Sequence, residues 1–157
     1  MKKSIPSNNK NIKLAILVDA DNASVANLNE LIVFATHYGQ ATVKRIYGDW
    51  SRPALSSRKE PAREYSFRLI EALPYVKGKN TTDISLIIDA MDLLHSGSVD
   101  GFCIASSDSD YTPLAQRIRE EGLLILGYGE SKTPESFINS CKDFKFSDKS
   151  TDSLVKA

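Results

Sequence analysis

Residues 14–22 read Leu-Ala-Ile-Leu-Val-Asp-Ala-Asp-Asn, a short apolar run that ends abruptly in acids. Residues 102–110 repeat this pattern as Phe-Cys-Ile-Ala-Ser-Ser-Asp-Ser-Asp. Such runs are typical of buried strands in a parallel sheet. A further acid, Asp83, opens a helix-like segment after the polar stretch 77–82. In an open α/β sheet, ligands bind outside the carboxyl ends of the strands, so we expect these acids to meet at one edge of the sheet.

Apolar runs alternate with amphipathic stretches along the rest of the chain. Strands are expected at 13–19, 41–49, 100–106 and 123–128, with a short edge strand at 73–76 that contains Pro74. Helices are expected from Asn22 or Ser24 to His37, and at 61–72, 82–96, 113–121 and 134–141, with residues 50–60 as a loop. The helix at 82–96 should bury one face made of Ile84, Ile87, Ile88, Met91 and Leu94. This alternation predicts an α/β fold of three layers, Rossmann-like, with a mostly parallel central sheet.

The length and composition indicate one globular domain. The 157 residues have the composition of an average soluble protein and contain no run long enough to span a membrane. We expect a disordered tail at 1–11, a domain at 12–147, and a tail or the start of a linker at 148–157. The N-terminus lacks the apolar middle of a secretory signal, and Cys103 and Cys141 have no metal-type spacing. These features predict a cytoplasmic protein without a membrane partner; a homodimer is left open.

Charge is divided unevenly along the chain although the formal net charge is zero. Residues 1–79 hold 13 Lys and Arg against 7 Asp and Glu, and residues 80–157 hold 7 against 13, which accounts for the totals of 20 and 20. One interpretation is a basic surface that guides nucleic acid toward an acidic site; solvated helix faces of opposite bias are the other. Under the first, the residues expected to contact nucleic acid are Arg52, Arg58, Lys59, Lys79 and, by stacking, Trp50.

Four acids form the candidate site. Asp21 or Asn22, Asp83, and Asp108 or Asp110 could each be a helix cap, but capping does not explain why separate segments place Asp at the same edge of the sheet. Carboxylates gathered there would repel one another, and a divalent cation resolves that conflict. Since Mg²⁺ and Mn²⁺ prefer carboxylate and water ligands, either ion is the expected cofactor. The candidate ligands and catalytic residues are Asp19, Asp83, Asp108 and Asp110.

A phosphatase of the haloacid dehalogenase type is one alternative. Residues 15–21 resemble the opening motif of that family, an apolar strand followed by Asp-x-Asp, in which Asp19 would be the nucleophile. Ala23 stands where that motif has Thr or Val, and an early helix leaves no room for the flap of that family. A dinucleotide site is excluded because the first turn lacks the Gly-x-Gly-x-x-Gly pattern.

Taken together, the motifs resemble the NYN branch of the PIN-like nucleases, in its LabA-like subgroup. The motifs are residues 18–23, 79–83 leading into Asp89, 104–114, and 127–130 with 133–137. The resemblance implies a Rossmann-like parallel sheet and metal-dependent hydrolysis of RNA, single-stranded in the first instance. It implies that the four acids form the acidic set. In the mechanism that fits both the residues and the resemblance, Asp19 and Asp108 are direct ligands, Asp83 is a ligand directly or through water, and Asp110 holds water or acts as a base. More peripheral polar positions are Asn22, Asp89, Ser106 and Ser107. Because not every member of the family has a demonstrated activity, a non-catalytic RNA-binding or scaffold role is the remaining alternative.

Overall fold

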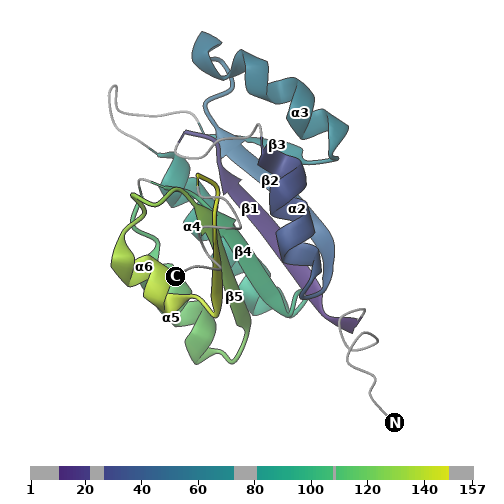
Figure 1. Cartoon of the computed structure of the whole chain (residues 1–157). Helices are drawn as coiled ribbons and strands as arrows, with labels where there is room; N and C mark the ends of the chain where they lie inside the picture. Colours follow the sequence, from purple (N-terminus) through teal and green to yellow (C-terminus); the bar gives the residue numbers. More distant parts are fainter. Residues whose placement is uncertain (1–10, 22–26, 73–80, 108, 149–157) are drawn as a thin grey trace.

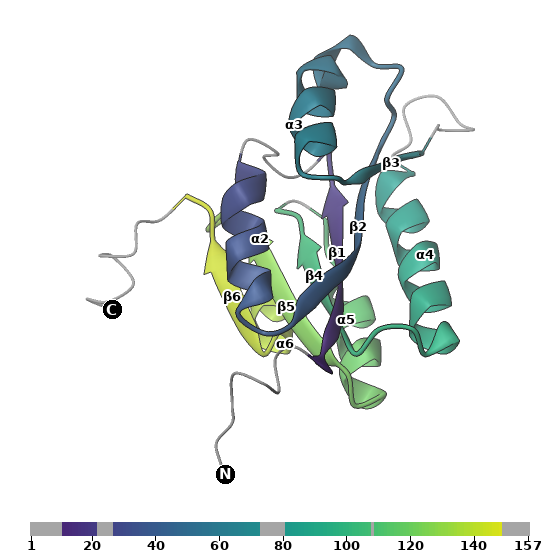
Figure 2. The same cartoon turned by 90° about the vertical axis from the view of Figure 1, so that its right-hand side faces the viewer.

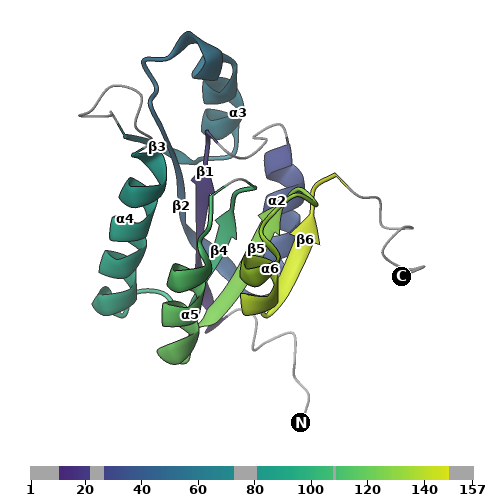
Figure 3. The ribbon, with the colours of Figure 1, turned by 90° about the vertical axis from the view of Figure 1, so that its left-hand side faces the viewer.

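A computed structural model of the chain describes residues 11–21, 27–72, 81–107 and 109–148. Its centre is a six-stranded sheet in the order β3-β2-β1-β4-β5-β6, and every pair of neighbouring strands is parallel. Figures 2 and 3 show this order from β3 at one edge to β6 at the other. The strands are β1 (Lys13–Asp19), β2 (Gln40–Gly48), β3 (Arg68–Glu71), β4 (Gly101–Ala105), β5 (Leu124–Gly129) and β6 (Asp143–Phe146).

Helices cover both faces of the sheet (Figure 1). They are α2 (Leu28–Thr36), a 3₁₀ helix η2 (Pro53–Arg58), α3 (Lys59–Glu64), α4 (Thr82–Ser96), α5 (Thr112–Glu120) and α6 (Glu135–Ser140). One core cluster joins Leu31 of α2 and Ala62 of α3 to Ile16 of β1. The other joins Leu86 of α4 and Ile118 of α5 to Leu17 of β1, so successive residues of β1 face opposite layers. The predicted three-layer α/β fold is confirmed. None of the described helices combines the length and apolar character needed to cross a membrane.

The two central strands are buried because their apolar residues face helices on both sides. All residues from Leu14 to Asp19 and from Gly101 to Ala105 are buried. The strands pair in register, with Val18 opposite Ala105. The strand order reverses between β1 and β4, since the chain proceeds outward to β2 and β3 on one side and to β5 and β6 on the other. The carboxyl ends of β1 and β4 therefore form the switch point of the sheet.

Two predicted segments are wrong in the region before α4. The helix expected over 61–72 ends at Glu64, because Ser66 takes a left-handed conformation with φ of 63°. After this turn the chain becomes the edge strand β3, where residues 65–72 had been assigned to a helix. The expected strand 73–76 and the expected helix start at 22–24 lie outside the described residues. The loop expected at 50–60 contains η2 and the start of α3, and β6 was not predicted at all.

The helix α4 has the predicted extent, and its expected buried face is correct in part. Leu94 is buried, and Ile87 and Met91 are partly buried against the core, as expected. Ile84 and Ile88 are instead 53% and 58% exposed, and Leu86 and Ala90 complete the buried face. All these residues recur at helical spacing, so periodicity alone could not fix which way the helix is turned.

Candidate active site

Asp19 is at the centre of the candidate site and is 0% exposed. It is the last residue of β1 at the switch point of the sheet. Its Oδ1 accepts a hydrogen bond from the backbone N–H of Asp21, at 3.1 Å. Its Oδ2 accepts hydrogen bonds from three hydroxyl groups, of Tyr111 at 2.9 Å, Ser106 at 3.4 Å and Ser109 at 3.5 Å. All three hydroxyls come from the segment that follows β4, so this segment and the end of β1 form one unit.

Asp83 lies close enough to this unit to act on it electrostatically. The pKa of Tyr111 is raised far above its ordinary value, first by burial, then by the charge of Asp19 and its hydrogen bond, and also by the charge of Asp83. Asp83 is in the first turn of α4, and its own Oδ1 accepts from the N–H of Ile84 at 2.9 Å. The charge of Asp83 therefore acts on the same hydroxyl that donates to Asp19.

Asp21 connects three segments around Asp19. Its Oδ2 accepts a hydrogen bond from Thr82 at the start of α4, at 2.5 Å. Its Oδ1 lies 3.1 Å from Nη1 of Arg52, in the turn before η2. Arg58, at the end of η2, donates to the backbone oxygen of Ala20 at 2.6 Å. The sequence allowed a capping role for Asp21, but the structure uses it to join the β1 turn to α4 and η2.

Asp110 lies in the loop after β4 but has a different role from Asp19 in the structure. It is exposed, and its Oδ1 accepts from the backbone N–H of Thr112 at 2.9 Å and from the Thr112 hydroxyl. A carboxylate that accepts from the N–H two residues further on forms an Asx turn, here directly before α5. Of the other acids and polar residues expected here, Asp108, Asn22 and Lys79 lie outside the described residues.

Ser106 and Ser107 are both buried, at 1% and 3% exposure, and each links β4 to a neighbouring segment. Ser106 donates to Asp19, as described above, and Ser107 Oγ accepts from the N–H of Glu130 after β5, at 2.9 Å. Gly129 approaches the backbone of Ser106 so closely that a Cβ there would lie 2.3 Å from the Ser106 oxygen. The ends of β4 and β5 are thus tightly fitted beside Asp19.

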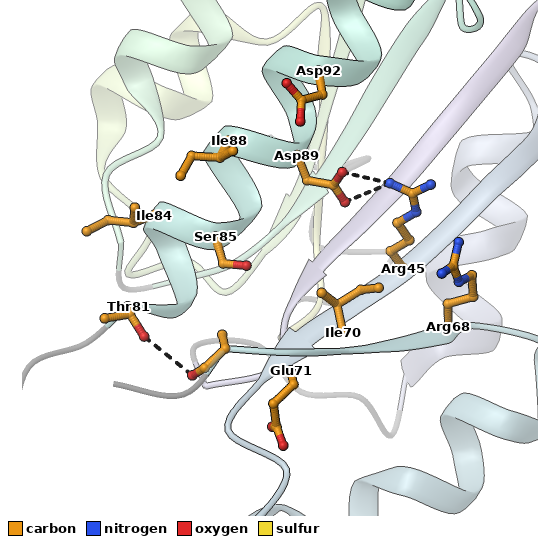
Figure 4. A pocket seen from close by; sticks show the side chains of 11 residues that line it. Arg45, Arg68, Ile70, Glu71, Thr81, Ile84, Ser85, Ile88, Asp89 and Asp92 are labelled. Carbon is orange, nitrogen blue, oxygen red and sulfur yellow. Dashed lines mark hydrogen bonds and ion pairs between the residues drawn. The ribbon is translucent and has the colours of Figure 1, made fainter. Parts of the chain in front are cut away.

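Asp89 lies away from this centre and serves the packing of α4. Both of its oxygens accept from Nη1 of Arg45, at 2.8 and 2.7 Å, and Oδ2 also accepts from the fully buried Tyr47 hydroxyl. Figure 4 shows the Asp89–Arg45 pair in a groove of about 670 Å³ between α4 and β3, where Ile84 and Ile88 also lie. Asp89, expected at a peripheral position of the site, therefore makes a partly buried ionic contact between α4 and β2.

The residues expected to contact nucleic acid divide into two groups. Arg52 is half exposed and lies beside the acidic turn, and Lys59 is the first residue of α3. Trp50 is only 7% exposed, its indole N–H donates to the backbone oxygen of Ile70 at 3.0 Å, and it packs in the core with Leu55. A base cannot stack on an indole buried in this way, so the stacking prediction for Trp50 is corrected.

The oxygen-rich donor set suits a hard divalent cation. Asp19, Asp83 and Asp110 supply carboxylates, and no cysteine or histidine is among them, which matches the ligand preference of Mg²⁺ or Mn²⁺. Among the described residues there is no group of three Asp, Glu, His or Cys side chains close enough to hold a metal on their own. Asp19 and Asp83 together with water ligands would suit Mg²⁺, which is commonly bound by one or two carboxylates and keeps several waters.

The chain is similar to one protein family and to a solved structure. Residues 13–148 match the model of the NYN domain. The solved structures include a similar one, the crystal structure of a protein of unknown function, VPA0982, from Vibrio parahaemolyticus RIMD 2210633. The two share 21% sequence identity with a TM-score of 0.72, over 94% of this chain and 97% of the other, which supports the fold alone. No match is found among the curated proteins.

Proposed function

Since the chain belongs to the NYN domain family, we propose that it is a metal-dependent ribonuclease that hydrolyses phosphodiester bonds of single-stranded RNA at the Asp19 site. The observation that supports this most strongly is the junction of the end of β1 with the start of α4, where Thr82, the neighbour of Asp83, donates a hydrogen bond to Asp21 at 2.5 Å. In the same region Asp19 accepts the hydrogen bond of Tyr111. We also propose that the chain is a member of the LabA-like subgroup of this family.

Asp19 and Asp83 would hold one Mg²⁺ or Mn²⁺, with Asp108 as the third carboxylate. When bound, such an ion supplies positive charge against the phosphate and makes water easier to deprotonate. The exposed carboxylate of Asp110 can accept a proton from the attacking water, because only one of its oxygens is engaged by Thr112. Arg52 can turn from Asp21 toward a phosphate oxygen, since its side chain is 51% exposed.

The phosphatase alternative is less well supported than the nuclease. A nucleophilic Asp must reach the phosphorus atom of its substrate, and both oxygens of Asp19 accept hydrogen bonds inside a buried site. A divalent ion must also come within about 2.0–2.1 Å of a carboxylate oxygen, so the burial of Asp19 does not distinguish the two functions. The match of residues 13–148 to the NYN domain favours the nuclease.

The test is incubation of the purified chain with end-labelled single-stranded RNA in Mn²⁺, Mg²⁺ or EDTA. We expect cleavage with either ion and none in EDTA. Asp83→Asn should abolish cleavage, while Asp92→Asn on the same helix, which changes an exposed acid outside the centre, should retain it. Equal cleavage by both variants would place the activity elsewhere. RNA binding without cleavage would support the non-catalytic alternative, and turnover of small phosphomonoesters would support the phosphatase.

A further inference from the structure

Tyr111 is the N-cap residue of α5, and its side chain is 0% exposed. Its ring packs against Phe137 of α6, with the ring centroids 6.2 Å apart and the planes tilted by 59°. The ring thus belongs to the core between α5, α6 and the sheet. Only the hydroxyl reaches beyond this core, and it reaches Asp19.

The hydroxyl of Tyr111 makes the shortest of the three hydroxyl contacts to Asp19 Oδ2. Its distance is 2.9 Å, against 3.4 Å for Ser106 and 3.5 Å for Ser109. The other oxygen of Asp19 is held by the N–H of Asp21, which belongs to the β1 turn. The carboxylate is therefore fixed at both ends, by the backbone on one side and chiefly by Tyr111 on the other. Removing the phenol oxygen would take away the shortest of the described contacts to Oδ2.

We propose that Tyr111 is a positioning residue that orients the Asp19 carboxylate for the divalent ion of the proposed nuclease site. This inference rests on the proposed function, because it assigns Asp19 the same role. Groups that hydrogen-bond to a metal-binding carboxylate fix its direction, and changing such groups typically weakens metal affinity 10- to 100-fold. A rigid core ring that presents one hydroxyl is well suited to this task, since it loses little freedom when the ion binds.

Tyr128 provides a matched control. It is 2% exposed, and its hydroxyl donates to a carboxylate, Oε1 of Glu30 on α2, at 2.7 Å. Tyr128→Phe therefore removes the same kind of buried hydrogen bond from the opposite layer of the fold, away from the candidate acids that the structure describes. Both substitutions retain the aromatic ring and its packing.

The experiment is calorimetric titration of Mn²⁺ into the full chain without RNA, together with thermal unfolding in EDTA. Tyr111→Phe should weaken Mn²⁺ binding by about 10- to 100-fold, and Tyr128→Phe should change it by less than about twofold. The melting temperatures in EDTA should fall by similar amounts in the two variants, because each loses one hydrogen bond. In cleavage assays, Tyr111→Phe should recover activity as the Mn²⁺ concentration rises, as expected when the ion binds weakly but the reacting groups remain.

Two outcomes would overturn the inference, and they can be told apart. If the wild type binds Mn²⁺ and Tyr111→Phe binds it equally well while losing thermal stability, Tyr111 serves packing alone and the proposed function is untouched. If the wild type binds no Mn²⁺, the metal site itself is refuted, and the positioning role falls with it.

Discussion

Substitution of Asp89 by alanine should show that this acid supports the fold rather than the candidate site. The change removes the acceptor of two groups at once. Arg45 loses an ion pair in which the side chains are 20% and 25% exposed, and the fully buried Tyr47 hydroxyl loses its carboxylate. Exposed pairs contribute at most about 1 kcal/mol, and breaking a buried pair costs about 3–5 kcal/mol, so this half-buried pair should cost about 2 kcal/mol. A buried hydroxyl without an acceptor costs about 1–3 kcal/mol more.

The gain in helix propensity on replacing Asp by Ala offsets about half a kcal/mol of this loss. The net expectation is a free energy of unfolding about 3 kcal/mol lower, measured by urea denaturation at neutral pH. Mn²⁺ affinity of the folded variant should equal that of the wild type. In the Asp89→Ala background, a further Tyr47→Phe change should cost much less than in the wild type, because the hydroxyl has already lost its partner. A loss below about 1 kcal/mol, or additive effects of the two changes, would refute the assigned role of the network.

Three further predictions concern the turns and edges around the site. Gly129→Ala should lower the free energy of unfolding by about 1–3 kcal/mol in urea denaturation, because the new Cβ would lie 2.3 Å from the backbone oxygen of Ser106. An unchanged urea midpoint would show that the ends of β4 and β5 are not tightly packed here. Arg52→Gln should reduce the slope of log affinity for single-stranded RNA against log salt concentration by about 0.7, as expected for the loss of one phosphate contact. Arg58→Gln should mainly lower thermal stability, because it removes the donor to the Ala20 oxygen. The same slope for Arg52→Gln and the wild type would exclude a phosphate contact of Arg52. Burial, then the hydrogen bond and charge of Asp143, raise the pKa of Tyr38 from 10.0 to about 12. The stability that this shift contributes is therefore complete below pH 10 and is lost as the pH rises through about 12. Tyr38→Phe should show a smaller decline in the free energy of unfolding across this range, and parallel curves for variant and wild type would contradict the shift.

The sequence predicted the elements that have a single strong pattern. The run ending at Asp19 could only be a buried strand, and its acid reached the switch point because parallel strands end together. The same reasoning indicated the strand before Ser106 and the helix that begins near Asp83. The helix expected over 61–72 failed on a single backbone conformation, since the left-handed Ser66 ends α3 and is followed by β3. No residue pattern distinguishes this turn from a continuing helix.

The side chains that surround Asp19 were harder to predict than the acid itself. Tyr111 follows the Asp-Ser-Asp run directly and precedes a helix, a position that could have identified it, but only tertiary packing shows that its hydroxyl reaches β1. The links of Asp21 to Thr82 and Arg52 likewise join segments far apart in the sequence. Trp50 appeared suited to stacking because polar residues follow it, whereas the structure buries it against Leu55. In short segments between helices and strands, the local sequence is a poor guide to whether a side chain is buried.

We expect the acids at the end of β1 and at the start of α4 to hold one divalent ion. The most direct measurement is anomalous diffraction from crystals of the chain soaked in Mn²⁺. One strong anomalous peak is expected, about 2 Å from a carboxylate oxygen of Asp19 and within reach of Asp83 directly or through water. A well-diffracting soak without a peak at Asp19, or with its only peak elsewhere on the molecule, would contradict the account.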